Sequence, residues 1–114
     1  MAKYKLIVLI NAIEGREDEF NNWFTNQHVP DVLTIPGMKT AQRFELAEHQ
    51  REGAKKEFRF LTLYDVETDD LPWVINEMKI RQGTPQMVST DTIAPPASIH
   101  FFEPITELVT SAED

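Results

Sequence analysis

The chain has 114 residues, no cysteine, a net charge of −8 and 41% apolar residues. This length suits one domain of ordinary size, and the apolar content is enough to build a core. The acidic balance disfavours nucleic acid and anionic membrane surfaces, because both bind clustered Lys and Arg. Without cysteine there is no disulfide framework, thiol nucleophile or thiolate metal site.

The first strand is expected over residues 3–11. Its inner part, Leu6 to Ile10, is apolar at every position, which is typical of a strand buried on both faces. The run is too short for a membrane helix and lacks the small-residue cleavage site of a secretory signal. A cytoplasmic protein is therefore expected.

A helix is expected from about Arg16, because three acidic residues follow where the helix dipole favours them. Aromatic and polar residues then recur at helical spacing. They are Phe20, Trp23, Phe24, Gln27 and His28. Pro30 should kink or restart this helix, and Pro36-Gly37 should form a turn.

Two more strands are expected, over 38–46 and 57–66, joined by the charged loop 47–56. Both show period-two alternation of side chains. In the first of them, the alternation places Met38 and Phe44 on one face.

A second helix should begin at Asp69 or Asp70, with Pro72 in its first turn and Gly83 closing it. The segment 84–97 follows, rich in Thr and Pro. It is long for a connection in a compact domain, which favours a lid or an interface segment.

The last strand is expected over 98–108, within a single domain covering 1–109, and 110–114 should be a flexible tail. The element order predicts an α+β, ferredoxin-like βαββαβ fold with an antiparallel sheet. Its two helices can cover only one sheet face. The other face is either packed on an identical sheet in a homodimer, which we favour, or solvated with a modest apolar patch.

The pattern Trp23-x4-His28-x-Pro30, followed by Pro36-Gly37 and Arg43-Phe44, resembles the EthD-like branch of the dimeric α+β barrel superfamily. The similarity is good over about the first half of the chain. The second half matches in element order and in its aromatic strands. The resemblance implies a dimeric α+β barrel. Relatives include antibiotic-biosynthesis monooxygenases, polyketide cyclases, muconolactone isomerases and haem-degrading enzymes.

Such proteins typically hold an apolar ligand between the sheet and the helices, and EthD-like members often carry a histidine where His28 stands. Histidine titrates near neutral pH, so His28 is the leading candidate for a general acid or base. Asp31, three residues on, could orient its ring. The alternative is a histidine that caps a helix end and is bonded to backbone.

Two further candidates for catalysis lie on strands. Arg43 could bind a carboxylate or enolate oxygen through two hydrogen bonds, or it could pair with a neighbouring acid such as Glu45 or Asp65. Tyr64 could donate its hydroxyl to a ligand oxygen, or it could be a packed ring with a satisfied hydroxyl.

The candidate ligand contacts comprise an amide at the end of the first strand, the carboxylate beside His28 and an aromatic lining. They are Asn11, Trp23, Phe24, Asp31, Phe44 and Phe60. Most of the aromatic rings are expected to be core rather than ligand contacts. His28, His49 and His100 show no metal-ligand spacing, and no glycine-rich phosphate loop is present, so neither a metal nor a cofactor is expected.

Two functions of different class remain open. The first is a cofactor-free enzyme of dehydratase, isomerase, cyclase or monooxygenase type that acts on a small, apolar, oxygenated molecule, with His28 as proton shuttle. The second is a non-catalytic ligand-binding or assembly protein of a degradation or biosynthesis pathway. A pocket that presents His28 favours the enzyme, whereas a closed, dry core around the ring favours the second.

Overall fold

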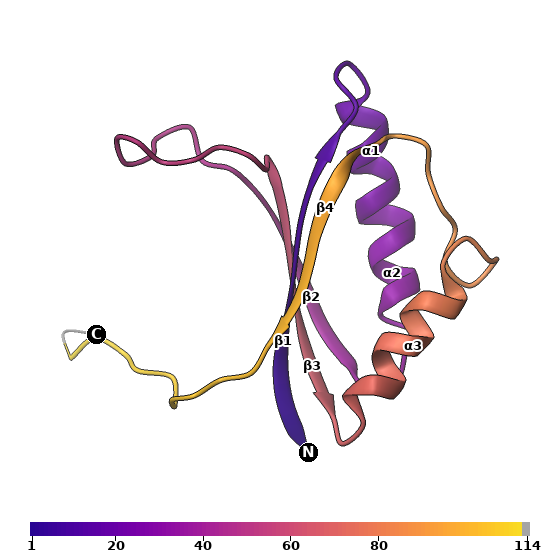
Figure 1. Ribbon diagram of the computed structural model, residues 1–114, viewed down its shortest axis with the longest axis vertical. Helices are drawn as coiled ribbons and strands as arrows, with labels where there is room; N and C mark the ends of the chain where they lie inside the picture. Colours follow the sequence, from indigo (N-terminus) through magenta and orange to yellow (C-terminus); the bar gives the residue numbers. More distant parts are fainter. Residues whose placement is uncertain (113–114) are drawn as a thin grey trace.

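The computed structural model describes residues 1–112 and shows a four-stranded antiparallel sheet with helices packed on one face (Figure 1). The elements are β1 (Ala2–Ala12), α1 (Glu17–Trp23), the π-helical turn η1 (Phe24–His28), α2 (Val29–Val32), β2 (Met38–Glu45), β3 (Phe60–Thr68), α3 (Leu71–Arg81) and β4 (Ile93–Phe102). The strand order is β2-β3-β1-β4. The predicted ferredoxin-like α+β fold is therefore confirmed. No helix within residues 1–112 is long and apolar enough to cross a membrane.

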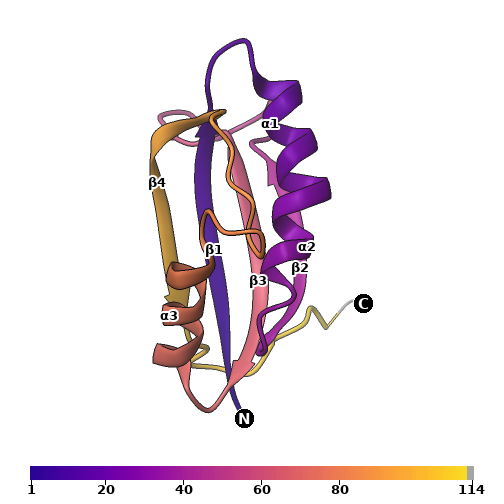
Figure 2. The ribbon, with the colours of Figure 1, turned by 90° about the vertical axis from the view of Figure 1, so that its right-hand side faces the viewer.

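The core lies between the sheet and the helices. Residues of β3 alternate strictly, so that Phe60, Thr62, Tyr64 and Val66 are buried under the helices. Phe20 of α1 stacks obliquely on Phe60, with the ring centroids 5.3 Å apart. Burial of these aromatic rings fixes the α1–η1–α2 rod over the β3 side of the sheet (Figure 2).

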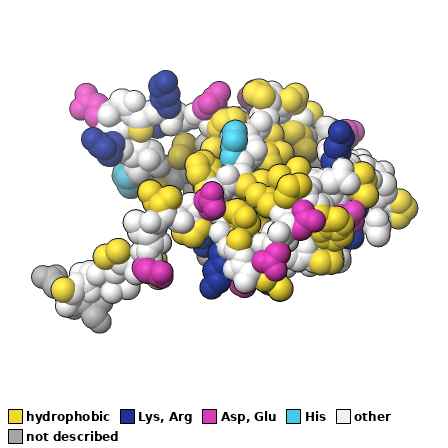
Figure 3. Space-filling view, turned by 60° about the horizontal axis from the view of Figure 1, so that its bottom comes forward, with side chains coloured by type: hydrophobic (Ala, Val, Ile, Leu, Met, Phe, Trp, Pro, Cys, Tyr) yellow, Lys and Arg dark blue, Asp and Glu magenta, His cyan; other side chains and the backbone are white. Residues whose placement is uncertain are grey.

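The opposite sheet face carries no helix and is flanked by two protruding segments (Figure 1). We call the β2–β3 connection, residues 46–59, the hairpin arm and residues 103–112 the C-terminal arm. Both arms stand apart from the body, and apolar side chains are exposed on the body and along the arms (Figure 3). Ile105 and Leu108 of the C-terminal arm are 95% and 92% exposed.

Gly37 makes the predicted turn before β2. Its φ of +105° is an angle that glycine adopts easily and other residues rarely adopt. A side chain would also be crowded, because an added Cβ would lie 3.3 Å from both the Glu67 carbonyl oxygen and Val74 Cγ2. The sequence prediction that Met38 and Phe44 share a face is wrong. The register shifts between Met38 and Thr40, so Met38 is buried under the helices while Phe44 lies on the open face.

The last strand differs from its predicted span of 98–108. It begins earlier, at Ile93, runs through the cis Pro95-Pro96 bond and ends at Phe102. Prolines are tolerated here because β4 is an edge strand, whose outer backbone groups need no ladder partner. Of the predicted tail 110–114, residues 113 and 114 lie outside the described residues.

Around Pro30, where a kink or restart was predicted, α1 passes through η1 and α2 begins at Val29 without a side-chain cap. In η1 the helix widens, and the Val29 amide bonds the Phe24 carbonyl five residues back. A proline cannot donate to the helical ladder, and its ring crowds the preceding turn. The wider turn accommodates Pro30, and η1 places His28 at the cavity described below.

Candidate functional site

A cavity of about 600 Å³ lies between the sheet and the helices. Its floor comes from β1, β3 and β4, through residues such as Val8, Tyr64 and Ile99. One wall is formed by the end of α1 with η1 and α2, and the other by α3. Residues 84–92, which we call the covering segment, run between these walls (Figure 2). Most of the lining side chains are apolar, which is typical of small-molecule sites.

His28 lies in the wall formed by η1, between two aromatic rings. Its ring stacks on Trp23 at 4.7 Å between centroids and meets Phe24 edge-on at 4.8 Å. All three residues line the cavity. Among residues 1–112, neither ring nitrogen of His28 has a hydrogen-bond partner, and neither is among the fully enclosed polar atoms. The imidazole is therefore presented to the cavity, as the sequence pattern predicted.

Burial lowers the pKa of His28 to about 4, from an ordinary value of 6.5. Removal from water disfavours the charged imidazolium, and this effect outweighs the attraction of the Asp31 carboxylate. The positive charge of Arg43 lowers the pKa further. At neutral pH the ring is thus uncharged, with one nitrogen able to donate and the other able to accept a hydrogen bond.

Tyr64 lines the cavity floor with its ring, but its hydroxyl oxygen is enclosed and has no partner among the described residues. Burial raises the pKa of this hydroxyl above its usual range, so it stays protonated. The alternative of a satisfied hydroxyl is therefore not what the structure shows. In this arrangement the hydroxyl also does not reach the cavity surface.

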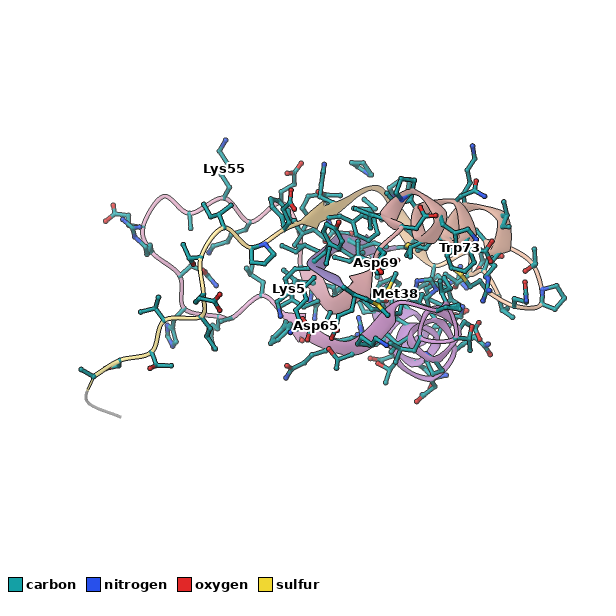
Figure 4. The ribbon with its side chains drawn as sticks, turned by 90° about the horizontal axis from the view of Figure 1, so that it is seen from below. Lys5, Met38, Lys55, Asp65, Asp69 and Trp73 are labelled. Carbon is teal, nitrogen blue, oxygen red and sulfur yellow. The ribbon has the colours of Figure 1, made fainter. Side chains whose placement is uncertain are left out.

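Arg43 does not line the cavity. Its guanidinium donates to Asn21 Oδ1 at 2.9 Å and to Thr25 Oγ1 at 3.0 Å, and it lies over the Phe24 ring at 4.6 Å. The expected pairing with Glu45 or Asp65 is absent from the described ion pairs; Asp65 instead pairs with Lys5 (Figure 4). Arg43 therefore ties β2 to α1 and η1 from behind the His28 wall.

Asp31 makes no hydrogen bond to His28. Its Oδ2 instead accepts from Gln27 Nε2 at 2.8 Å and from the Val88 amide at 3.1 Å. The Val88 carbonyl accepts from Trp23 Nε1 at 3.0 Å. Both backbone groups of Val88 are thus bonded to the helical rod, which holds the covering segment over the cavity.

Three other predicted ligand contacts lie away from the cavity. Asn11 accepts from the Arg59 amide and donates to the Glu57 carbonyl, both at 2.8 Å. These bonds replace strand pairing there, which is why β3 starts at Phe60 rather than at 57. Phe60 is core, and Phe44 is 40% exposed on the open sheet face.

The sequence reading missed the α3 and β4 contributions to the cavity. Ile75, Met78 and Lys79 of α3 line it with helical spacing, and Gln82, directly after the helix, lines it as well. The sheet face on which each β4 residue lies could not be predicted, because this strand was expected to begin at residue 98 rather than at Ile93.

Residues 1–112 contain no group of three or more His, Asp or Glu side chains that could hold a metal ion. Besides Tyr64, whose hydroxyl is enclosed, the polar side chains that line the cavity include those of His28, Lys79, Gln82, Ser89 and Thr90.

Solved structures with the same fold span almost the whole chain. The haem degrader MhuD from Mycobacterium tuberculosis, with two haems bound in its active site, matches at 18% identity and a TM-score of 0.65, over 93% of this chain and 99% of that one. An EthD-like protein from Ralstonia eutropha matches at 15% identity and a TM-score of 0.59, over 95% and 96%. An EthD family protein from Bacillus halodurans matches at 15% identity and a TM-score of 0.52, over 90% and 99%.

No family model and no curated protein matches the sequence. At these identities the structural likeness establishes the fold. The chain shares its ferredoxin-like α+β fold with these proteins, and the resemblance to EthD-like proteins inferred from the sequence is confirmed at the level of the fold.

Proposed function

We propose that this protein binds a small, apolar, oxygenated molecule in the cavity between its helices and its sheet. The observation that carries the proposal is the uncharged imidazole of His28, which has no hydrogen-bond partner within residues 1–112 and lies in the wall of an apolar cavity. A polar group in such surroundings gains a hydrogen bond when a ligand oxygen reaches it. The cavity volume of about 600 Å³ falls within the range of small-molecule sites.

The proposal extends to cofactor-free proton transfer by His28. A neutral imidazole can accept a proton from an acidic C–H or O–H group of the ligand. The lowered pKa of His28 makes the resulting imidazolium costly, by about 3 kcal/mol relative to water. The ligand anion formed in the same step would lie beside the imidazolium and offset much of this cost.

The fold likeness to a haem degrader supports a site for large, flat, apolar molecules. The aromatic pair Trp23 and Phe24 gives such a molecule a stacking surface beside His28.

Binding is tested by isothermal titration calorimetry with 2-naphthol, a flat apolar probe that carries one hydroxyl. Ala97→Trp places an indole at the cavity lining, and Gln50→Trp places one in the hairpin arm as a control. Wild type and Gln50→Trp should bind, and Ala97→Trp should not. Equal binding by all three would place the probe elsewhere and contradict the proposal.

Proton transfer is tested with 2-tetralone, whose protons beside the carbonyl exchange with deuterium through an enolate. NMR follows the exchange with wild type, His28→Gln and the control His49→Gln. His28→Gln should lose about a hundredfold of the protein-dependent rate, in line with the usual contribution of a general base. Retained exchange would show that the protein binds without transferring a proton, which is the non-catalytic alternative.

We further propose that the open sheet face packs against a second copy of this chain. Ile7 pairs with Leu63, and Leu9 pairs with Leu61, so the centre of this face is apolar. The hairpin arm and the C-terminal arm project on the same side of the sheet (Figure 1), where both can contact a second copy packed on the open face. A cytoplasmic location stays a prediction from the sequence.

A further inference from the structure

We propose that the ligand of this cavity carries a carboxylate, which Lys79 binds at the cavity mouth with help from Gln82 and Ser89. This inference rests on the proposed binding function and names the class of ligand. The three side chains come from the last turn of α3, its end and the covering segment, and all three residues are exposed and line the cavity.

Lys79 has no competing partner in the described part of the chain. The ion pairs between residues 1–112 engage Lys5, Arg16, Arg59 and Arg81, and no acidic residue lines the cavity. Arg81, in the same helical turn, is occupied by Glu77 at 3.0 Å. A cation in the last turn of a helix is favoured by the dipole, but the dipole does not explain why this one faces the cavity.

The neighbouring polar groups suit a carboxylate as well. Within residues 1–112, neither the side-chain amide of Gln82 nor the hydroxyl of Ser89 makes a hydrogen bond. The Thr90 hydroxyl, in contrast, is already bonded to the Thr92 hydroxyl at 2.8 Å. One ammonium, one amide and one hydroxyl together offer donors to both oxygens of a carboxylate.

A single positive charge matches a monoanion. The chain has a net charge of −8, so a phosphate dianion would meet general repulsion with one cation to offset it. Beside Lys79 on α3 lie Ile75 and Met78, and these give the ligand an apolar surface next to its charged end. The ligand class is therefore an amphipathic ring acid whose body enters the cavity.

The test compares 2-naphthoate with 2-naphthamide, two probes of equal shape that differ in charge. Calorimetry at low ionic strength is run on wild type, Lys79→Gln and the control Lys55→Gln. Lys55 lies in the hairpin arm, which stands apart from the body (Figure 4) and does not line the cavity, and Lys79 is exposed, so neither change should disturb folding. Wild type and Lys55→Gln should prefer naphthoate about fivefold, a preference that Lys79→Gln removes and that high salt weakens.

Equal affinity of wild type for the two probes, or a naphthoate preference that survives in Lys79→Gln, would overturn the carboxylate assignment and leave the binding proposal standing. Failure of both probes to bind wild type would overturn the binding proposal itself. The two failures are therefore distinguishable in one experiment.

Discussion

The buried imidazole of His28 should make the stability of this protein depend on pH in a defined window. In the unfolded chain His28 binds a proton below its ordinary pKa of 6.5, whereas in the folded chain it does so only below about 4. Between these values the unfolded state holds more protons, so the free energy of unfolding falls as the pH falls. The loss is about 2 kcal/mol at pH 5 relative to pH 8, and it approaches about 3 kcal/mol near pH 4.

The assay is urea unfolding followed by tryptophan fluorescence at pH 8 and pH 5, at one fixed protein concentration because association would add its own contribution. His28→Gln removes the titrating group and should lose about 2 kcal/mol less than wild type between the two pH values. His49→Gln, in the exposed hairpin arm, should behave as wild type. If wild type and His28→Gln lose the same stability, the ring is not held neutral by burial, and the account of the site fails.

Three further predictions concern other parts of the molecule. Tyr64→Phe should leave the free energy of unfolding unchanged or raise it by about 1 kcal/mol, because it removes an enclosed hydroxyl that has no partner among the described residues; a clear destabilisation in urea would show a bond that these residues do not make. Asp31→Ala should speed hydrogen exchange at the Val88 amide by an order of magnitude or more, because it removes the carboxylate that accepts from this amide, one of the two bonds that tie Val88 to the helical rod; unchanged exchange would mean that another contact protects the amide. Leu63→Asp should convert a dimer to a monomer by light scattering, because it places a charge at the centre of the open sheet face; a wild type that is already monomeric would refute the dimer.

The fold was predictable because its signals are local. A few neighbouring residues are enough to define each element. The run Leu6–Ile10 is fully apolar, β3 alternates between buried and partly buried residues, and Gly37 and Gly83 mark a turn and a helix end. Given the order of elements, few antiparallel arrangements remain. The errors arose where tertiary context decides: the bulge at Lys39, which reverses the faces of β2, and the edge position that lets β4 run through prolines.

The candidate site was predicted only in the part that one helix supplies. Trp23, Phe24 and His28 recur at helical spacing and do face the cavity. Arg43 and Asp31 were placed in the site by proximity in sequence or by chemistry. The structure instead shows them fixing the wall and the covering segment, because their partners lie on other elements that the sequence does not bring together.

The central claim, that the cavity binds a small oxygenated molecule, is tested most directly by the two indole signals of the protein. Trp23 lines the cavity, whereas Trp73 on α3 does not and is 41% exposed to solvent (Figure 4). In a ¹⁵N NMR titration with 2-naphthol, the Trp23 indole N–H signal should shift and saturate while the Trp73 signal stays in place. A Trp23 signal that does not move, or a shift confined to Trp73, would contradict the account.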